Sequence, residues 1–253
     1  MGITDRLKQQ YNRALFRPSL LGLLVNPFYI IRQGLYRGVF RYRGYMRGRL
    51  LDFGCGSKPY KDLFAVSEYI GTDIETSGHD HRNEEIDVYY DGRTLPFPDA
   101  SFDSIFSSEV FEHIFNLPEI LDELYRVLKP GGYMLITVPF VWDEHEIPYD
   151  FARYTSFGLR HILTEKQLQV VEAHKSTDYV ATIFQMWAAY VYQHILPRRK
   201  AFRIALTPLL VTPVTVCGLL LSAVLPKNQH FFHNNILVVQ KPLSPATHEP
   251  FQS

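Results

Sequence analysis

Cysteine is scarce in this chain of 253 residues. The two cysteines, Cys55 and Cys217, supply neither a disulfide framework nor the clustered ligands of a structural zinc site. A secretory signal is also missing, because the apolar stretch at 20–25 is short and lies between Pro18 and Pro27. We therefore expect a protein of a reducing, cytoplasmic environment.

Net charge is absent overall, since 26 Lys and Arg balance 26 Asp and Glu, but the charges are unevenly distributed. Residues 1–50 hold ten Lys and Arg and one acid, Asp5, which by subtraction leaves 16 basic and 25 acidic residues for the rest. A basic leader at 1–49 suggests an anionic partner, and its interleaved aromatic residues suit a membrane surface. Helices packed on the domain with solvated arginines explain the leader equally well. Nucleic acid is a weaker alternative, because no recognition motif accompanies the leader.

Charge is missing again between Arg203 and Lys227, where the sequence is apolar over a length that could span a bilayer. We predict that 178–230 is an apolar helical hairpin inserted before the last strand and lying in the membrane interface. Pro208, Pro213 and the basic turn at 197–200 argue against a simple span. A spanning or re-entrant pair, and a soluble lid or dimer face, remain alternatives.

Strand and helix patterns alternate through the centre of the chain. Strands are expected at 50–53, 68–73, 85–90, 102–107, 133–139, 168–173 and 235–240, and helices at 58–64, 117–128 and 157–163. This rhythm predicts an α/β fold with a doubly wound, mostly parallel, seven-stranded sheet of the Rossmann-like kind. The expected divisions are a leader at 1–49, a core at 50–177, the insertion at 178–230, and the last strand with its tail at 231–253.

The first strand runs into Gly54-Cys55-Gly56, a turn at which backbone can lie against a ligand. A dinucleotide-binding turn requires G-x-G-x-x-G, and here Gly56 is followed by Ser57, Lys58 and Pro59. The missing third glycine argues against a nicotinamide cofactor, although an acid after the second strand would also suit an NAD ribose.

Four segments in order, LLDFGCG, IGTDIE, DGRTLPFPDASFDSIFSSEVFEHI and ELYRVLKPGGYMLITVPF, resemble the class I S-adenosylmethionine-dependent methyltransferases. Within that class the chain is most similar to the group that includes the ubiquinone and menaquinone methyltransferases. The resemblance covers about residues 48–175 and the final strand, and it implies S-adenosylmethionine as the cofactor. The cofactor-binding residues that it implies are Asp52, Gly54, Cys55, Gly56 and Ser107 towards the methionine part, Asp73 at the ribose, and Asp91 with Gly92 at the adenine. The thiol of Cys55 itself is expected to be packed rather than nucleophilic.

The loop at 140–155 follows the fifth strand, where this fold places the methyl acceptor. His145 is our candidate base, because an imidazole accepts protons near neutrality, and a purely structural histidine is the alternative. Asp150 and Arg153 are spaced to pair on one helical turn and to shape the site. Glu112-His113 is interpreted mainly as a helix-start and packing feature. No metal is expected, and His79 and His81 are interpreted as solvated.

We expect a methyltransferase on the inner face of a membrane that methylates an oxygen of a glycan, a lipid-linked sugar or another amphiphilic small molecule. The alternatives are a quinone-precursor C- or O-methyltransferase and a catalytically silent cofactor-binding partner of a membrane complex. No oligomeric state is predicted.

Overall fold

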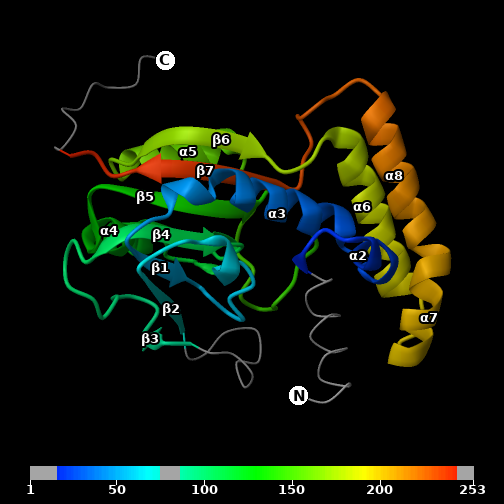
Figure 1. Cartoon of the computed structure of the whole chain (residues 1–253), viewed down its shortest axis with the longest axis horizontal. Coiled ribbons are helices and arrows are strands. Elements are labelled where there is room, and N and C mark those ends of the chain that lie inside the picture. Colours follow the sequence, from blue (N-terminus) through cyan, green and yellow to red (C-terminus); the bar gives the residue numbers. More distant parts are fainter. Residues whose placement is uncertain (1–15, 75–85, 244–253) are drawn as a thin grey trace. The chain divides into compact units, whose positions relative to one another are not determined.

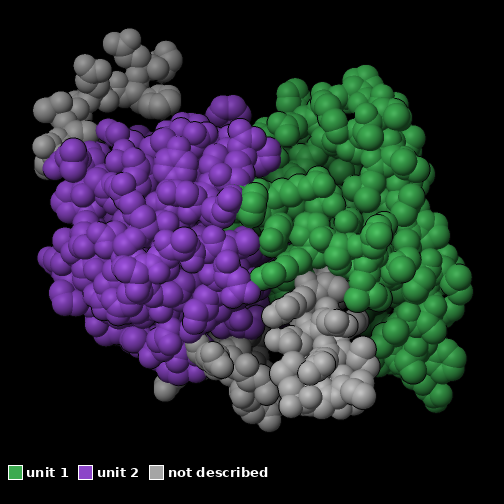
Figure 2. Space-filling view, viewed as in Figure 1, with its two compact units in different colours: residues 1–40, 175–234 green, residues 41–174, 235–253 purple. Residues whose placement is uncertain are grey.

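The computed structural model describes residues 16–74 and 86–243, which form parts of two compact units. Figure 2 distinguishes a helical unit, residues 1–40 and 175–234, from a sheet unit, residues 41–174 and 235–253. Residues 16–40 of the basic leader therefore belong to the same unit as the apolar insertion, whereas residues 41–49 belong to the sheet unit. Sequence periodicity does not indicate this grouping.

The sheet unit is built on seven strands in the order β3-β2-β1-β4-β5-β7-β6. The strands are β1 (Arg49–Phe53), β2 (Glu68–Ile74), β3 (Val88–Tyr90), β4 (Phe102–Ser108), β5 (Leu128–Pro139), β6 (Gln169–Lys175) and β7 (Asn234–Gln240). Neighbours from β3 through β5 pair in parallel, whereas β7 runs against the direction of β4 and β6 in Figure 1. The predicted doubly wound, mostly parallel, seven-stranded Rossmann-like sheet is confirmed.

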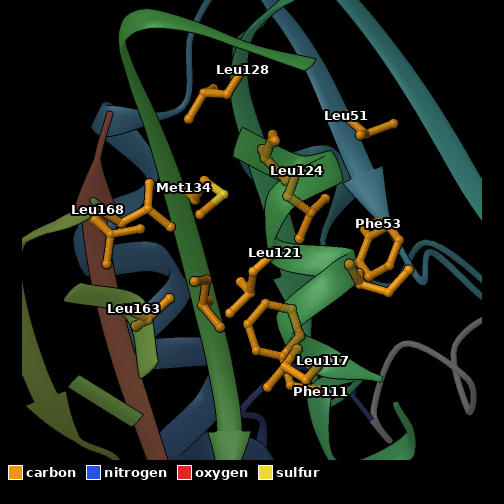
Figure 3. Packing of buried hydrophobic residues seen from close by; sticks show 14 of the residues in the cluster. Leu51, Phe53, Phe111, Leu117, Leu121, Leu124, Leu128, Met134, Leu163 and Leu168 are labelled. Carbon is orange, nitrogen blue, oxygen red and sulfur yellow. The ribbon is translucent and has the colours of Figure 1, made fainter. Parts of the chain in front are cut away.

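Helix α4 (Leu117–Val127) covers one face of this sheet. Pro118 occupies its first turn, where the missing amide hydrogen costs nothing, and apolar residues recur with the helical period. Figure 3 shows Leu121 and Leu124 in the same buried cluster as Phe53 of β1 and Met134 of β5. Helix α5 (Ser156–Glu165), which Thr155 caps by accepting a hydrogen bond from the Gly158 amide, adds Leu159 and Leu163 to this cluster.

The expected helix at 58–64 is wrong. This segment contains one 3-10 turn, Lys61–Leu63, in which the Leu63 amide donates to the Tyr60 carbonyl. Lys58 has a φ of 52°, a conformation that cannot start a right-handed helix, and Pro59 follows it. The segment between β1 and β2 is instead held by Tyr60 and Phe64, whose rings pack on Phe106.

Two strands begin three residues or more away from the expected start, and the other five differ by one or two residues at an end. Strand β3 begins at Val88 rather than at 85. Strand β5 begins at Leu128 rather than at 133, so Pro130-Gly131-Gly132 lies within the strand. Phe102 pairs with Leu128 and Ser104 with Tyr133, and the irregularity between these two pairs accommodates the glycines, of which Gly131 has a φ of 75°.

The helical unit contains α2 (Leu20–Val25), most of α3 (Tyr29–Tyr42), α6 (Tyr179–Tyr190) with a π-helical turn at Val191–Ile195, α7 (Lys200–Leu210) and α8 (Thr212–Val224). Helices α6 and α8 lie side by side (Figure 1), and the backbone at Gly218 touches Phe184 so closely that no Cβ fits there. The buried Gln185 joins the leader to the insertion, since its Oε1 accepts hydrogen bonds from the Ile30 and Ile31 amides at 3.0 and 3.2 Å. The predicted apolar insertion is thus helical throughout most of its length.

Candidate active site at the carboxyl ends of the strands

The turn after β1 is shaped by its two glycines. Gly54 and Gly56 have φ values of 69° and 43°, and a Cβ on Gly54 would collide with the methyl groups of Val110. The amides of Gly54 and Cys55 donate to the Thr72 carbonyl at 2.9 and 3.1 Å, which attaches the turn to β2. Backbone therefore forms this wall, as the glycine pattern predicts.

Asp73 ends the buried part of β2 beside that turn. Its Oδ2 accepts a hydrogen bond from the Gly56 amide at 3.0 Å, and its Oδ1 accepts from the Ile74 amide at 2.9 Å. The residue is 7% exposed, so its carboxylate is held in one orientation at the carboxyl end of the strand.

An open cleft of about 540 Å³ lies at this edge of the sheet. It has the position at which open α/β sheets bind ligands, outside the carboxyl ends of the strands. Its lining comprises Gly54, Gly56, Asp73, Ile74, Tyr90, Glu109, Val110, His113, Ile114 and Glu146. Three of the predicted cofactor-binding residues, Gly54, Gly56 and Asp73, are among them.

Asp52 and Cys55 are buried near the turn and are not among the residues that line this cleft. The Tyr69 hydroxyl donates to Asp52 Oδ2, and burial raises the pKa of Asp52 to about 7 despite that bond and the charge of Lys58. The Cys55 thiol lies against Gly71, where a Cβ would come within 2.7 Å of it, and burial raises its pKa. These surroundings are those of a packed thiol, and contact of Asp52 with the cofactor stays a prediction.

The remaining predicted cofactor residues lie on β4 and after β3. Asp91 Oδ1 accepts hydrogen bonds from the Thr94 and Arg93 amides at 2.7 and 2.8 Å, which lower the pKa of Asp91 and form a tight turn with Gly92 at a φ of 78°. Ser107 is buried, and its hydroxyl has no hydrogen-bond partner within residues 16–74 and 86–243. Their contacts with a cofactor stay predictions as well.

The loop after β5 is organised by the Asp150–Arg153 pair. Arg153 donates from Nη1 to Asp150 Oδ1 at 2.6 Å and from Nη2 to Oδ2 at 2.7 Å. Burial alone would raise the pKa of Asp150, but these bonds and the His145 amide outweigh burial and lower it to about 2. The expected pairing is confirmed, although both residues lie in a loop without regular secondary structure rather than on a helical turn.

His145 is held by this pair and faces a second histidine. Its amide donates to Asp150 Oδ2 at 2.9 Å, and its Nδ1 lies 3.1 Å from the Asp143 carbonyl. The ring meets the His113 ring edge-on, with centroids 4.7 Å apart. Of the two imidazoles, that of His113 belongs to the cleft lining.

Glu112 and His113 are the site residues that sequence reasoning underrated. They form a 3-10 turn at Phe111–His113 just after β4, and the Glu112 carbonyl accepts hydrogen bonds from the Phe151 and Ala152 amides. Burial, reinforced by the Glu109 carboxylate, holds the pKa of Glu112 well above its usual range, and burial lowers the pKa of His113. Their position after a strand that ends at the cleft is the signal that could have identified them. His79 and His81 lie outside the described residues.

Comparisons with known proteins agree with this geometry. Residues 51–136 match the family model described as a methyltransferase domain. Over 95 residues the chain is 36% identical to the malonyl-[acyl-carrier protein] O-methyltransferase of Erwinia pyrifoliae, a match that covers 35% of this chain and 36% of that protein. Over 70 residues it is 40% identical to the ubiquinone/menaquinone biosynthesis C-methyltransferase of Pseudoalteromonas translucida, covering 26% of this chain and 28% of that one.

The crystal structure of the [4+2]-cyclase SpnF superimposes with a TM-score of 0.54 and 18% identity, covering 84% of this chain and 82% of that chain. At this identity the likeness concerns the fold. The chain spans about a third of the length of the first relative above. The predicted resemblance is confirmed for the sheet unit, and S-adenosylmethionine is its cofactor.

Proposed function

We propose that this chain, which carries a class I S-adenosylmethionine-dependent methyltransferase domain, methylates an oxygen of a glycan, a lipid-linked sugar or another amphiphilic acceptor at the inner face of a membrane. The observation that carries the membrane part is the inverted burial of helices α6, α7 and α8, where small and polar side chains face inward and large apolar ones face outward.

Helix α8 shows this inversion most clearly. Its buried residues are Thr212, Thr215 and Gly218, whereas Leu220 is 63% exposed and Val224 is 77% exposed. In water this arrangement forgoes the free energy of burying the apolar side chains, about 1.5–3 kcal/mol for each. In a membrane it is the usual arrangement, because small residues allow close helix packing and large apolar residues face lipid.

The same inversion extends over α2, α6 and α7, whereas α3 buries Ile30, Leu35 and Val39. Helix α6 buries Ala181, Thr182 and Gln185, and the only residue that α7 buries among those described is Thr207. The large apolar residues exposed on α2, α6, α7 and α8 are Leu20, Leu21, Leu24, Tyr179, Ile183, Trp187, Tyr190, Phe202, Ile204, Leu209, Leu210, Leu220 and Val224. An exposed apolar surface of this breadth is unusual in a soluble monomer.

The segment Lys200–Val224 is long and apolar enough to cross a membrane, and 28% of its most apolar stretch is buried. We favour the hairpin lying in the interface over a span, because Arg198, Arg199 and Lys200 stand at its turn, where lipid phosphates would meet them. A lipid-linked acceptor would give both the basic leader and the apolar hairpin a role in reaching substrate.

The cleft of the sheet unit would hold the methyl donor. We assign the Gly54–Gly56 turn and Asp52 to its methionine part, Asp73 to its ribose hydroxyls, Asp91 and Gly92 to its adenine, and Ser107 to the methionine side. The bound cofactor supplies a sulfonium methyl group that an oxygen nucleophile can displace in line. Placement of that oxygen against the methyl group provides most of the rate.

The acceptor oxygen loses its proton as the new carbon–oxygen bond forms. The His113–His145 pair stands at the end of the cleft and would promote this loss, with His113 nearer to the cleft than the predicted base His145. Asp150 and Arg153 act as positioning residues, because their bonds hold the His145 backbone and the Asp143 carbonyl.

The test supplies radiolabelled S-adenosylmethionine to the full-length protein with a polar-lipid extract that contains lipid-linked glycans. We expect label in the lipid-linked fraction and none with Asp73→Ala. Label that enters only aromatic quinone precursors would replace this proposal by the quinone alternative, which the similarity to the quinone C-methyltransferase favours. Cofactor binding without transfer to any fraction would support the silent-partner alternative.

A further inference from the structure

Three potential metal ligands meet at the acceptor end of the cleft: Glu112, His113 and His145. One ligand atom from each lies within 4.8 Å of the others. Glu146 lies at the rim of this group, with Oε2 3.9 Å from His113 Nε2. No metal is expected from the sequence, in which Glu112-His113 is interpreted as a helix-start and packing feature.

Both imidazoles are oriented through one nitrogen by a backbone carbonyl. His113 Nδ1 lies 2.8 Å from the Tyr149 carbonyl, and His145 Nδ1 lies 3.1 Å from the Asp143 carbonyl. A carbonyl oxygen can only accept, so each of these contacts is made with the hydrogen on Nδ1, which leaves the lone pair of a neutral ring on Nε2. His145 Nδ1 also lies 3.3 Å from Asp150 Oδ2, an acceptor, and 3.4 Å from Arg153 Nη2, a donor. An Nδ1 hydrogen given to a carbonyl is the outer-shell arrangement usual for histidines that bind metals.

The Glu112 carboxyl group supplies the second, independent observation. Glu112 is 0% exposed, and neither side-chain oxygen has a hydrogen-bond partner within the described part of the chain. The His113 Nε2 atom lies 3.8 Å from Glu112 Oε1, beyond hydrogen-bond distance. A buried carboxyl group without a hydrogen-bond partner is costly, and a bound cation would offset this cost. The charge of Arg153 also acts on Glu112, and the buried Arg153 Nε has no hydrogen-bond partner in the described residues.

We propose that Glu112, His113 and His145 bind a divalent transition cation of the Zn²⁺ and Co²⁺ class. Two imidazoles and a carboxylate suit these borderline cations, whereas Mg²⁺ and Ca²⁺ prefer oxygen ligands alone. Ligand atoms around tetrahedral Zn²⁺ lie about 3.3 Å apart, since each sits about 2 Å from the metal. The ligand atoms now lie within 4.8 Å of one another, so binding of the cation would draw them together by up to about 1.5 Å.

Three protein ligands leave a coordination position open, and His113 borders the cleft, so that position faces the acceptor. An acceptor hydroxyl bound there would lose its proton more readily to solvent or to the Glu146 carboxylate, and the two imidazoles would then act through the cation. This role in the reaction rests on the proposed function, whereas cation binding itself does not.

The experiment titrates the metal-stripped full-length protein with Co²⁺, followed by visible absorption, and then displaces Co²⁺ with Zn²⁺. We expect one Co²⁺ per chain, and at least about tenfold weaker binding in Glu112→Gln and in His145→Ala. The matched control is His161→Ala, because His161 is an exposed histidine of the same unit. Cofactor binding by each variant, measured in parallel, establishes that the cleft is intact.

Absence of Co²⁺ binding, or equal binding in wild type, Glu112→Gln and His145→Ala, overturns the site and leaves Arg153 as the partner of Glu112. Turnover that survives removal of a bound metal overturns its role in the reaction. The proposed function is judged separately by label transfer: a protein that binds Co²⁺ but methylates no lipid-linked acceptor keeps the site and loses the function.

Discussion

Helices α4 and α8 have almost the same length and opposite burial. Helix α4 buries Leu121 and Leu124 and turns Glu119 outward, whereas α8 buries Thr212 and Thr215 and leaves leucine and valine exposed. Helix α4 therefore follows the burial rule for a protein in water. Helix α8 has the opposite burial, which the proposed membrane location would explain.

Buried polar groups differ between the units in the same sense. The sheet unit buries the carboxyl groups of Asp52, Asp73 and Glu112, all near the cleft. The buried polar residues described in the helical unit are chiefly neutral Thr, Asn and Gln, and its buried Asp178 is paired with Lys227 at 2.6 Å. The buried carboxyl groups gather where the chemistry is proposed to take place, whereas the neutral polar residues join helices, as Gln185 does.

The largest expected effect concerns Asp52. Its pKa is raised to about 7 in the folded protein from a usual value of 3.8, so the folded state holds a proton that the unfolded chain has lost. Stability from this proton is present below pH 4 and is lost as the pH rises through 7, by up to about 4 kcal/mol. In the cofactor-free protein, Asp52→Asn should remove this loss, measured by urea unfolding at pH 5 and pH 8. An equal pH dependence in both proteins would show that Asp52 ionises normally.

The next effect tests whether the leucines of α4 are buried and those of α8 are exposed. Leu124→Ala should destabilise the protein by about 3 kcal/mol, because it leaves a cavity in a fully buried cluster. The matched control is Leu220→Ala on α8, which should change the free energy of unfolding in detergent-free buffer by less than about 0.5 kcal/mol. If the two substitutions cost the same, α8 buries its leucines and the comparison between the units fails.

Asp73→Ala should weaken cofactor binding without changing membrane binding. Loss of a carboxylate that accepts the ribose hydroxyls should weaken S-adenosylmethionine binding by roughly 10- to 100-fold, the value of one or two charged hydrogen bonds. Asp122→Ala is the control, since Asp122 makes an exposed ion pair with Lys166 on the same unit. Calorimetry measures the affinity, and vesicle binding should not change. If the affinity for S-adenosylmethionine is unaltered, Asp73 does not bind the ribose hydroxyls.

The smallest effect concerns the exposed face of α8. Leu220→Glu with Val224→Glu should weaken binding to anionic phospholipid vesicles by about tenfold or more, because both apolar side chains would lose their contact with acyl chains. Cofactor affinity should stay at the wild-type value. Flotation of the two proteins with vesicles provides the measurement, and the control replaces Thr164 and Glu165 of α5. If the wild-type protein binds no vesicles but forms a stable dimer, and the double variant is monomeric, the apolar face is a protein interface instead.

Local patterns sufficed for much of the fold and for part of the site. The strand before Gly54, the turn of Gly54 and Gly56, the acid at Asp73 and the amphipathic period of α4 each depend on residues close together in the chain. The Asp150–Arg153 pair is local too, although it lies in a loop. The helix predicted at 58–64 does not form, because Lys58 has a left-handed backbone conformation and Pro59 follows it.

What the sequence by itself determined is the methyl-donor cleft, because strand, turn and acid follow one another and parallel strands bring their ends to one edge. The tertiary structure alone decided the rest. The loop after β5 folds back onto the Glu112 carbonyl and thereby brings His145 to His113 across a wide gap in sequence. Gln185 joins the leader to the insertion in the same way, through contacts that no periodicity encodes. Burial is a property of neighbours in space, and for that reason neither the unpartnered carboxyl group of Glu112 nor the inverted faces of α6 and α8 could be predicted from the sequence.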